Sequence, residues 1–172
     1  MARLPDMTAD DDIAARIRAR RGGELRPLDA MLLHSPPVAD GWNQLMGAIR
    51  GETTVPPDLR ELVILRIAVL NDAPYEWDSH LEPARQAGLG EQHLAAIRAT
   101  DPAAPLSALQ QLVVTSTDAV TRGVRLPEPL FERLREQLSD RQVFELVTTM
   151  AAYNMVSRLV VALDISSPAA RA

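Results

Sequence analysis

The sequence predicts an all-α protein, and three observations lead to this expectation. Apolar residues make up 47% of the 172 residues but aromatic residues only 3%, so the core must consist mostly of Leu, Val, Ile and Ala. These residues suit packed helices better than strands rich in aromatic and β-branched side chains. No segment shows the alternation of apolar and polar residues that a half-buried strand requires. Proline and glycine divide the chain into segments of helical length, and we expect eight or nine helices.

Five helices are predicted in the first half of the chain, where proline opens helices and glycine closes them. They run from Thr8, as N-cap, to Gly22, from Pro27 to Leu33 or His34, over residues 38–51, from Pro56 to about Asn71, and from Pro74 to Ala87. The fourth is apolar on most of its sides, so we expect it at the centre of the core. We expect the arginine-rich first segment to lie on the surface.

Four further helices are predicted in the second half. They cover Gly90–Arg98, Ser107–Arg122, Pro127–Gln137 and Ser139–Leu163, and a loop rich in turn residues spans Thr100–Pro105. Gln follows both Ser107 and Ser139 three residues later, which is the spacing of a capping box that satisfies free backbone groups at a helix start. We expect a single domain over residues 1–172, with tails at residues 1–7 and 166–172.

The composition excludes several classes of function. The formal net charge is −5, whereas a protein that binds nucleic acid needs a basic surface to meet the phosphates. The chain has no Cys, which excludes disulfides, thiolate metal sites and mechanisms that need an attacking thiolate. It has no Lys, which excludes a Schiff-base lysine. We therefore expect no nucleic acid among its partners.

The start of the sequence and the length of its apolar runs predict a cytoplasmic protein. The first residues lack the apolar run of a secretory signal. The longest apolar runs, Leu62–Leu65 and Ile67–Leu70, are separated by Arg66 and are far shorter than a membrane span. We expect no contact with a membrane.

Glu61 is the first residue that could carry chemistry. On a helix its neighbours are Ile64, Leu65 and Ala68, all of them apolar. A lone ionised carboxylate on a packed face costs several kcal/mol unless it is paired or protonated. A functional role and a place at the exposed edge of the helix, beside Arg60, both remain open from the spacing alone.

Glu76 and His80 are the next candidates. Their separation of four residues places both side chains on one face of the helix that follows Pro74. A carboxylate beside an imidazole favours the protonated ring, which suits a general acid near neutral pH. A surface pair would satisfy the same spacing. Glu and His can also bind metals, but two ligands do not complete a site, and we expect no metal.

Four other side chains are weaker candidates for binding a substrate. Tyr75 and Trp77 flank Glu76 and could wall an apolar pocket, although a place in the core or an interface is equally compatible with the sequence. His34 precedes Ser35-Pro36 and fits a structural histidine as well as a site residue. Asn154 lies on the last helix, where a hydrogen bond between helices is the alternative to lining a pocket.

Taken together, these segments resemble the carboxymuconolactone decarboxylase-like superfamily, which includes the alkylhydroperoxidase D branch. The resemblance covers about residues 28–165. It is carried by the core segments Leu59–Ala68, Tyr75–His80 and Ala84–Leu89, and by the flanks Leu33–Pro36 and Tyr153–Arg158. It implies the helical alkylhydroperoxidase D-like fold and a site made of Glu61, Glu76 and His80.

The resemblance also implies which branch of the superfamily the chain is closest to. In the hydroperoxidase branch, a Cys-x-x-Cys pair lies between the Glu and the His, and its cysteines fall here on Ala73 and Glu76. Thiol peroxidase activity is therefore not expected. In the decarboxylase branch, a Glu stands four residues before the His, as Glu76 does here. Pro83 departs from the pattern and is expected to bend the helix just past His80.

By resemblance, we expect a cofactor-free enzyme that acts on a small unsaturated carboxylic acid or lactone. His80 would donate a proton after loss of carbon dioxide, Glu76 would orient the ring, and Glu61 would complete a relay or position the substrate. Isomerisation, dehydration or cyclisation of a related carbonyl compound is the alternative reaction. A non-catalytic ligand-binding protein of the same fold is the alternative from another class. The resemblance further implies a homo-oligomer, a trimer or a hexamer.

Overall fold

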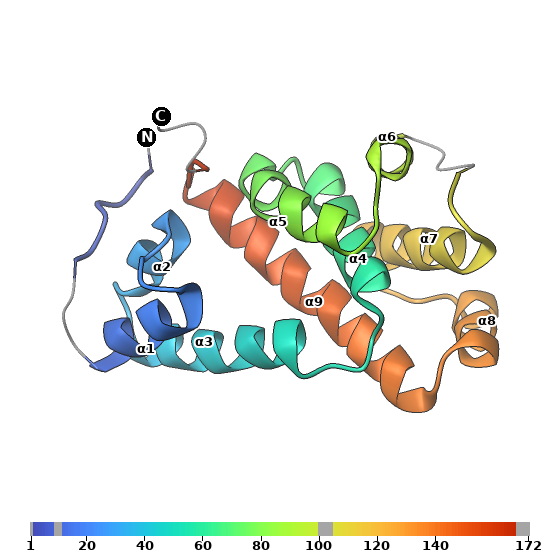
Figure 1. Cartoon of the computed structure of the whole chain (residues 1–172), viewed down its shortest axis with the longest axis horizontal. Helices are drawn as coiled ribbons and strands as arrows, with labels where there is room; N and C mark the ends of the chain where they lie inside the picture. Colours follow the sequence, from blue (N-terminus) through green and yellow to red (C-terminus); the bar gives the residue numbers. More distant parts are fainter. Residues whose placement is uncertain (1, 9–11, 100–104, 168–172) are drawn as a thin grey trace.

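The computed structural model describes residues 2–8, 12–99 and 105–167, and within these residues it contains nine α-helices and no strand (Figure 1). The predicted all-α fold is therefore confirmed. The helices are α1 (Asp12–Arg21), α2 (Pro27–Leu32), α3 (Pro36–Gly51), α4 (Pro57–Leu70), α5 (Pro74–Gln86), α6 (Glu91–Arg98), α7 (Ala108–Gly123), α8 (Glu128–Gln137) and α9 (Asp140–Ala162).

The predicted helix ends are confirmed where local chemistry determines them. The Ser107 hydroxyl accepts a hydrogen bond from the Gln110 backbone at 3.2 Å, and the Gln110 side chain accepts one in return from the Ser107 N–H at 3.0 Å. Ser139 and Gln142 form the same reciprocal pair at the start of α9. Beyond the end of α5, Gly88 adopts a φ of +93°, a backbone conformation that glycine adopts without steric cost.

One predicted boundary differs from the structure, and two other predictions fall on residues that the structure does not describe. Pro36 and Pro37 were expected to lie between two helices, but they form the first turn of α3. The N–H groups of a first turn have no partner within the helix, so proline costs no hydrogen bond there. The predicted start of the first helix after Thr8 falls on residues 9–11, which lie outside the described part of the chain, and the described part of α1 runs from Asp12. Most of the predicted Thr100–Pro105 loop also lies outside the described residues.

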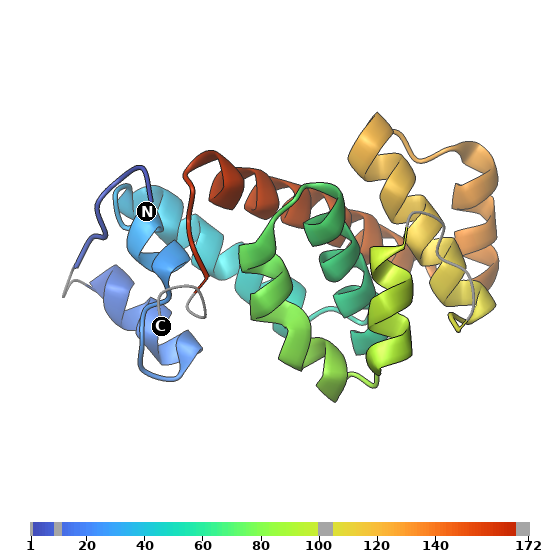
Figure 2. The ribbon, with the colours of Figure 1, turned by 90° about the horizontal axis from the view of Figure 1, so that it is seen from above.

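Helix α4 is central, as its apolar sequence predicted. Every residue from Glu61 to Ala68 is buried, and the helix packs against α5, α6, α7 and α9 (Figure 2). Two buried side chains in this run are charged, Glu61 and Arg66. Because a buried charge is costly without a partner, each must have a specific one.

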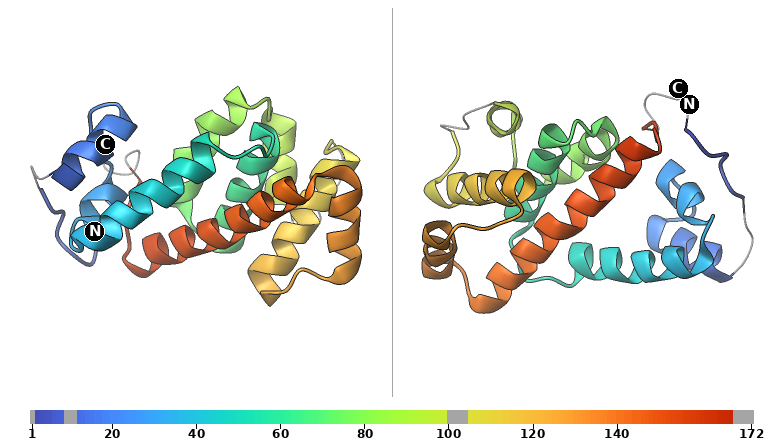
Figure 3. Two further views of the ribbon diagram at one scale, coloured as in Figure 1. Left: turned by 90° about the horizontal axis from the view of Figure 1, so that it is seen from below. Right: turned by 180° about the vertical axis from the view of Figure 1, so that it is seen from behind.

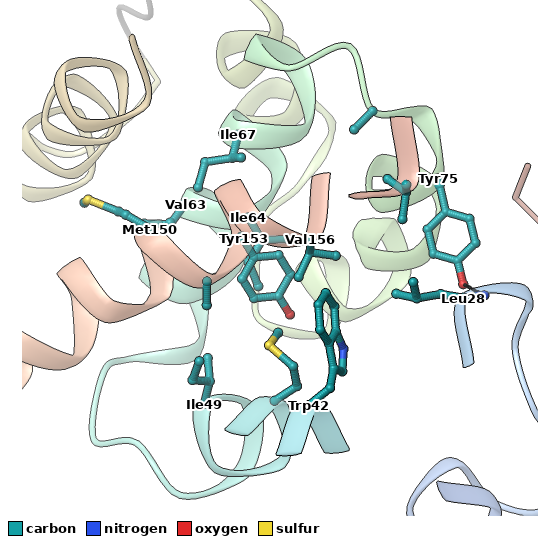
Figure 4. Close-up of a cluster of buried hydrophobic side chains, with 14 of the residues drawn as sticks. Leu28, Trp42, Ile49, Val63, Ile64, Ile67, Tyr75, Met150, Tyr153 and Val156 are labelled. Carbon is teal, nitrogen blue, oxygen red and sulfur yellow. Dashed lines mark hydrogen bonds between the residues drawn. The ribbon is translucent and has the colours of Figure 1, made fainter. Parts of the chain in front are cut away.

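Helix α9 crosses the length of the molecule and joins its two ends (Figure 3). Helices α1 and α2 lie at one end together with the start of α3, and α7 and α8 lie at the other. In the core, Val63, Ile64 and Ile67 of α4 pack with Met150 and Val156 of α9 (Figure 4). Of the helices described, none combines the length and the apolar character that crossing a membrane would take.

Candidate active site

Glu61 and His80 meet where α4 packs against α5. The Nδ1–H of His80 donates a hydrogen bond of 2.7 Å to Oε2 of Glu61, and both side chains are buried. The second carboxylate oxygen of Glu61 lies 3.4 Å from Nε of Arg60. A carboxylate can only accept, so this contact fixes the proton of His80 on Nδ1 and leaves Nε2 as the reactive nitrogen. The burial of Glu61 decides against the exposed helix edge that the sequence left open.

Glu76 lies on the other side of the same imidazole. Its Oε2 is 3.8 Å from His80 Nε2, too far for a hydrogen bond, and among the described residues this buried oxygen has no hydrogen-bond partner. Burial raises the pKa of Glu76, and the nearby His80 only partly opposes that effect. The expectation that Glu76 orients the ring therefore differs from the geometry, in which Glu61 does so across the helix interface.

Tyr153 and Arg50 complete the environment of His80, and neither was among the predicted site residues. The Tyr153 hydroxyl lies 3.2 Å from His80 Nε2, and the two rings are perpendicular with centroids 5.2 Å apart. Nε of Arg50 donates a hydrogen bond of 2.8 Å to the same hydroxyl. Since Arg50 occupies an acceptor position on the oxygen, the tyrosine proton is free to point at Nε2. Burial raises the pKa of Tyr153 to about 12, so its hydroxyl stays protonated at neutral pH.

His80 opens onto a pocket of about 370 Å³. The walls come from α1, from the residue before α2, from α3 and from α5, and the lining residues are Arg20, Arg21, Arg26, Gly47, Arg50, Gly51, Ser79, His80 and Pro83. The sequence left open an apolar pocket walled by Tyr75 and Trp77, but four arginines are among the residues that line this one. Such a pocket suits an anionic ligand, because guanidinium groups bind carboxylates and phosphates through paired hydrogen bonds.

The positive charge of the pocket is only partly neutralised. Arg21 makes two hydrogen bonds of 3.0 Å to the buried carboxylate of Asp29. Arg20 reaches Asp29 only at 4.0 Å and donates to the side chain of Asn43. Burial, reinforced by the neighbouring arginines, lowers the pKa of Arg20 to about 10, and the same causes lower the pKa of Arg26. The expectation that the arginine-rich first segment lies on the surface therefore holds only in part, because Arg20 and Arg21 are only partly exposed.

Local sequence explains why there is space beside His80. Gly47 and Gly51 lie one turn apart on the face of α3 that lines the pocket, where neither contributes a side chain. On the opposite wall, Pro83 has no N–H, so the helical bond to the Ser79 carbonyl is missing. Helix α5 nevertheless continues through Pro83 to Gln86, and the Ala87 N–H donates to the Pro83 carbonyl at 2.9 Å.

The predicted aromatic residues lie away from this pocket. Tyr75 is buried in the main core, where the Leu28 N–H donates to its hydroxyl at 3.4 Å (Figure 4). Trp77 belongs to a second apolar cluster, and the guanidinium of Arg98 stacks 3.7 Å from its ring centroid. Adjacent residues of a helix point about 100° apart, so sequence neighbours of Glu76 need not share its pocket.

His34 and Asn154 also do not line the pocket. His34 is exposed, and its Nε2 lies 2.8 Å from the Pro5 carbonyl. The buried Asn154 side chain donates to Thr121 Oγ1 at 3.0 Å and accepts from Asn71 at 3.1 Å. Asn154 therefore joins helices, which is the alternative that the sequence left open.

The arrangement can transfer protons and stabilise negative charge. A buried imidazole held by one carboxylate, with a tyrosine hydroxyl and a guanidinium beside it, has the groups that acid–base catalysis needs. No group of three or more His, Cys, Asp and Glu side chains that could hold a metal ion occurs among the residues described. The relevant residues come from α3, α4, α5 and α9, so only the packing of these helices brings them together.

Arg50 and Tyr153 escaped prediction because their partners are distant in sequence. Tyr153 is 73 positions from His80 and 103 positions from Arg50. Helical periodicity assigns both to faces that pack inward but does not show which polar atoms meet. A tyrosine inside the apolar run of α9 is the one signal available, since a buried phenol needs a polar partner.

The chain is similar to known proteins in both sequence and fold. The carboxymuconolactone decarboxylase family matches residues 36–115, which include Arg50, Glu61, Glu76 and His80. An uncharacterized protein of Bacillus subtilis (strain 168), YdfG, is 26% identical over 106 residues, which are 60% of this chain and 72% of that protein.

Several crystal structures share the helical architecture. An uncharacterized peroxidase-related protein of Silicibacter sp. TM1040 has a TM-score of 0.84 and 19% identity, over 98% of this chain and 93% of that one. A peroxidase-related protein of Ralstonia eutropha JMP134, described as an alkylhydroperoxidase AhpD core, has a TM-score of 0.84 and 17% identity. The match covers 96% of this chain and 92% of that one. The debrominase Bmp8, solved as a cysteine-to-alanine variant in complex with 2,3,4-tribromopyrrole, has a TM-score of 0.80 and 13% identity. The match covers 99% of this chain and 95% of that one.

Proposed function

We propose that this chain, which belongs to the carboxymuconolactone decarboxylase-like superfamily, is an acid–base enzyme acting on a small unsaturated carboxylic acid or lactone. The observation that carries the proposal is the buried hydrogen bond of 2.7 Å between Glu61 and His80 at the base of an arginine-lined pocket. A proton donor and an anion-binding wall at one place match the needs of a reaction that passes through a carbanion or enolate.

In the reaction we propose, a substrate carboxylate leaves as carbon dioxide. The electron pair of the broken carbon–carbon bond enters the unsaturated system and gives an enolate. His80, which must first take up a proton from solvent on Nε2, transfers that proton to carbon, so each turnover consumes one proton and releases one carbon dioxide. The substrate serves as its own electron sink, so the proposal needs no cofactor. Glu61 holds the ring through its hydrogen bond to Nδ1, which makes it the positioning carboxylate of this scheme.

Arg50 has a separate role in this proposal. A carboxylate that leaves as carbon dioxide loses its charge, so an arginine bound to it would stabilise the substrate more than the transition state. We therefore assign Arg50 to the enolate oxygen, where negative charge increases as the reaction proceeds. Its Nε is fixed by Tyr153, which holds the guanidinium beside His80. Thiol peroxidase chemistry has no place in this scheme, because the chain contains no cysteine.

The proposal is tested by the turnover of carboxymuconolactone. The wild-type protein should release carbon dioxide as the lactone is consumed, and His80→Gln should reduce the rate by roughly 10²–10⁴-fold because the proton donor is lost. His93→Gln, a change of the same kind on α6 and outside the pocket, is the matched control and should retain the rate. Full turnover by His80→Gln would remove His80 from the mechanism.

Other outcomes identify the alternative functions. Consumption of a substrate without release of carbon dioxide would favour isomerisation, dehydration or cyclisation by the same acid–base groups. If no related acid or lactone is turned over but such acids bind in the pocket, the non-catalytic ligand-binding alternative holds.

Glu61→Gln should reduce turnover more than Glu76→Gln, because Glu61 makes the direct hydrogen bond to the imidazole.

A further inference from the structure

Nε2 of His80, the nitrogen that gives up the proton in the proposed reaction, faces a hydroxyl group and a carboxylate. The Tyr153 oxygen lies 3.2 Å from it, and Oε2 of Glu76 lies 3.8 Å from it. All three side chains are buried, and His80 is the most exposed of them at 6%. Because water has little access to this place, the hydrogen-bond partner of Nε2 must come from these two groups.

The hydrogen bond between Tyr153 and His80 has a fixed direction. Nδ1 carries the ring proton, because it bonds at 2.7 Å to a carboxylate oxygen of Glu61 that can only accept. In the neutral ring Nε2 is then an acceptor, and the Tyr153 hydroxyl donates to it. Nε of Arg50 donates to the same hydroxyl oxygen at 2.8 Å, and burial raises the pKa of Tyr153 to about 12, so the phenol keeps its proton. The bonds run in one direction along these side chains, with Arg50 as the first donor and Glu61 as the last acceptor.

Uptake of a proton at Nε2 reverses what this nitrogen needs. A protonated ring has an N–H at Nε2 and requires an acceptor there. The Tyr153 hydroxyl is a poor acceptor, since Arg50 donates to its oxygen and its own proton points at the ring. Oε2 of Glu76 has no hydrogen-bond partner among the described residues, and a small shift of either side chain closes the present 3.8 Å to hydrogen-bond distance. Burial raises the pKa of Glu76 and a charged ring opposes that effect, so the pair shares one proton most favourably when Oε2 meets Nε2.

We propose that Tyr153 is a positioning residue that holds the neutral form of His80, and that uptake of the reacting proton transfers Nε2 from Tyr153 to Glu76. The inference rests on the proposed function, in which Nε2 gives a proton to carbon, and it adds how that nitrogen is held before and after it takes up the proton. The phenol satisfies the buried nitrogen of the neutral ring, and the carboxyl group of Glu76 faces the charged ring. This exchange explains why a buried oxygen of Glu76 lacks a partner in the described structure, where the ring is bonded as a neutral one.

Charged and titratable groups reach this ring from the helices around it. They are Arg50 of α3, Arg60 and Glu61 of α4, Glu76 of α5 and Tyr153 of α9, and Arg20, Arg21 and Arg26 share the pocket that His80 lines. Each of these groups contributes to the pH at which the ring takes up a proton. A change of that pH between variants that differ in one hydroxyl or one carboxylate therefore reports on the partners of Nε2.

The protonation of histidine in the resting protein tests the inference without any turnover. The ring nitrogens of isotope-labelled histidine should be followed by NMR while the pH is varied. Tyr153→Phe removes the donor to the neutral ring, so the pH at which half of the His80 rings are protonated should rise by about half to one unit. Glu76→Gln removes the charged acceptor, and this midpoint should fall by about one unit. His34 and His93 do not line the pocket, so they are internal references whose midpoints should not change.

Tyr75→Phe is the matched control for the loss of a buried tyrosine hydroxyl. Tyr75 lies on α5, and its hydroxyl accepts from the Leu28 N–H at 3.4 Å, so this variant should leave the His80 midpoint unchanged. Tyr153→Phe keeps the ring that stands perpendicular to the imidazole, with centroids 5.2 Å apart, and thermal unfolding verifies that the variant is folded. A role of Tyr153 in packing alone would lower stability without a change in the midpoint.

The outcomes that would overturn the inference differ from those that test the proposed function. A midpoint that stays the same or falls in Tyr153→Phe would contradict it, because the phenol would then not favour the neutral ring. A midpoint that stays the same or rises in Glu76→Gln would contradict it as well, because the charged ring would then not turn to Glu76. Either result can occur while His80→Gln still reduces the turnover of carboxymuconolactone, and the exchange of partners can be found in a protein that turns over no lactone.

Discussion

Two buried carboxylates flank one imidazole in this protein, and their environments give them different properties. Both oxygens of Glu61 have partners, in His80 at 2.7 Å and Arg60 at 3.4 Å. One oxygen of Glu76 is buried without a hydrogen-bond partner among the described residues, and burial raises its pKa. In proteins, two similar groups in different surroundings commonly divide acid and base roles between them. Glu61 is therefore suited to hold the imidazole in place, and Glu76 to carry a proton near it.

The raised pKa of Glu76 predicts how stability depends on pH. Above the ordinary value of 4.5, the unfolded chain releases the Glu76 proton more readily than the folded protein, so this residue lowers the free energy of unfolding as the pH rises. Glu76→Gln removes this effect and should be more stable than wild type at neutral pH, by about 1 kcal/mol. The difference should disappear towards pH 4.5, where the carboxyl of the unfolded chain becomes protonated.

Urea denaturation at a series of pH values provides the measurement. Glu82→Gln, an exposed glutamate on the same helix, is the control and should follow the wild-type curve. A Glu76→Gln variant that is less stable than wild type at neutral pH and equally affected at every pH would show that Glu76 contributes by packing and hydrogen bonding, not by titration.

At the scale of elements, α3 and α5 form two walls of the pocket with different local chemistry. The α3 wall has glycine at positions 47 and 51, one helical turn apart, and the α5 wall has Pro83 one turn beyond Ser79. Glycine inside a helix costs about 0.5–1 kcal/mol relative to alanine, so a helix that contains one in its interior is less stable than it could be. Here the missing side chain leaves space next to His80.

Two substitutions of Gly47 distinguish its effect on the stability of α3 from its effect on the space in the pocket. A Cβ at this position would meet the Cδ of Arg20 at 3.6 Å, an ordinary contact, so Gly47→Ala should raise the free energy of unfolding by about 0.5–1 kcal/mol. Gly47→Leu should fill the pocket and displace Arg20, and binding of anions should fall by about tenfold or more. Gly41→Leu, an exposed site on the same helix, should leave binding unchanged. Unchanged binding in Gly47→Leu would place the ligand elsewhere.

At the scale of the whole molecule, a buried arginine connects the central helix to its neighbours. Arg66 of α4 makes bonds of 2.6 and 2.7 Å to Asp118 of α7 and bonds of 2.7 Å to the carbonyls of Ile97 and Ala99 at the end of α6. The guanidinium thus satisfies two carbonyls that lack helical partners as well as a carboxylate. This contact lies on the side of α4 away from His80, so it stabilises the framework of the site without taking part in it.

Removal of this contact should affect the whole fold. Arg66→Met leaves Asp118 and two carbonyls without their partner and should cost about 3–5 kcal/mol. Thermal unfolding should show a decrease in Tm of about 2–4 °C for each kcal/mol lost. Arg122→Met is the matched control, because Arg122 pairs with the same Asp118 at 3.3 Å but is exposed, and its loss should cost below about 1 kcal/mol. Equal effects of both changes would contradict a structural role specific to Arg66.

Several apolar side chains remain exposed on the outside of the molecule. They include Val38 and Leu45 on α3, and Phe144, Met155 and Val161 on α9. Such side chains can be covered by further copies of the chain, and the trimer or hexamer that the resemblance implies stays a prediction.

The sequence predicted most of the helices because their ends depend on neighbours in the chain. Capping boxes at Ser107 and Ser139, the prolines that open α2, α4 and α5, and Gly88 beyond α5 all act over a few residues. A site shared by Glu61, Glu76 and His80 was predicted from the spacing within each helix and from the resemblance, with Glu76 as the residue that orients the ring. For Trp77 the sequence left open a pocket wall and a place in the core or an interface, and the structure places it in the second apolar cluster.

The residue pattern alone predicted the helical class, the position of most helix ends and the absence of thiol chemistry, and the resemblance added that Glu61, Glu76 and His80 share a site. The packing of the helices shows that Glu61, and not Glu76, bonds the imidazole, that Tyr153 and Arg50 join it, and that arginines line the pocket beside it. The difference follows from how far apart in the sequence the interacting residues lie. Helix ends and helix faces follow from backbone geometry over a few residues, but the partners of a buried polar atom are fixed by packing between segments as far as 103 positions apart.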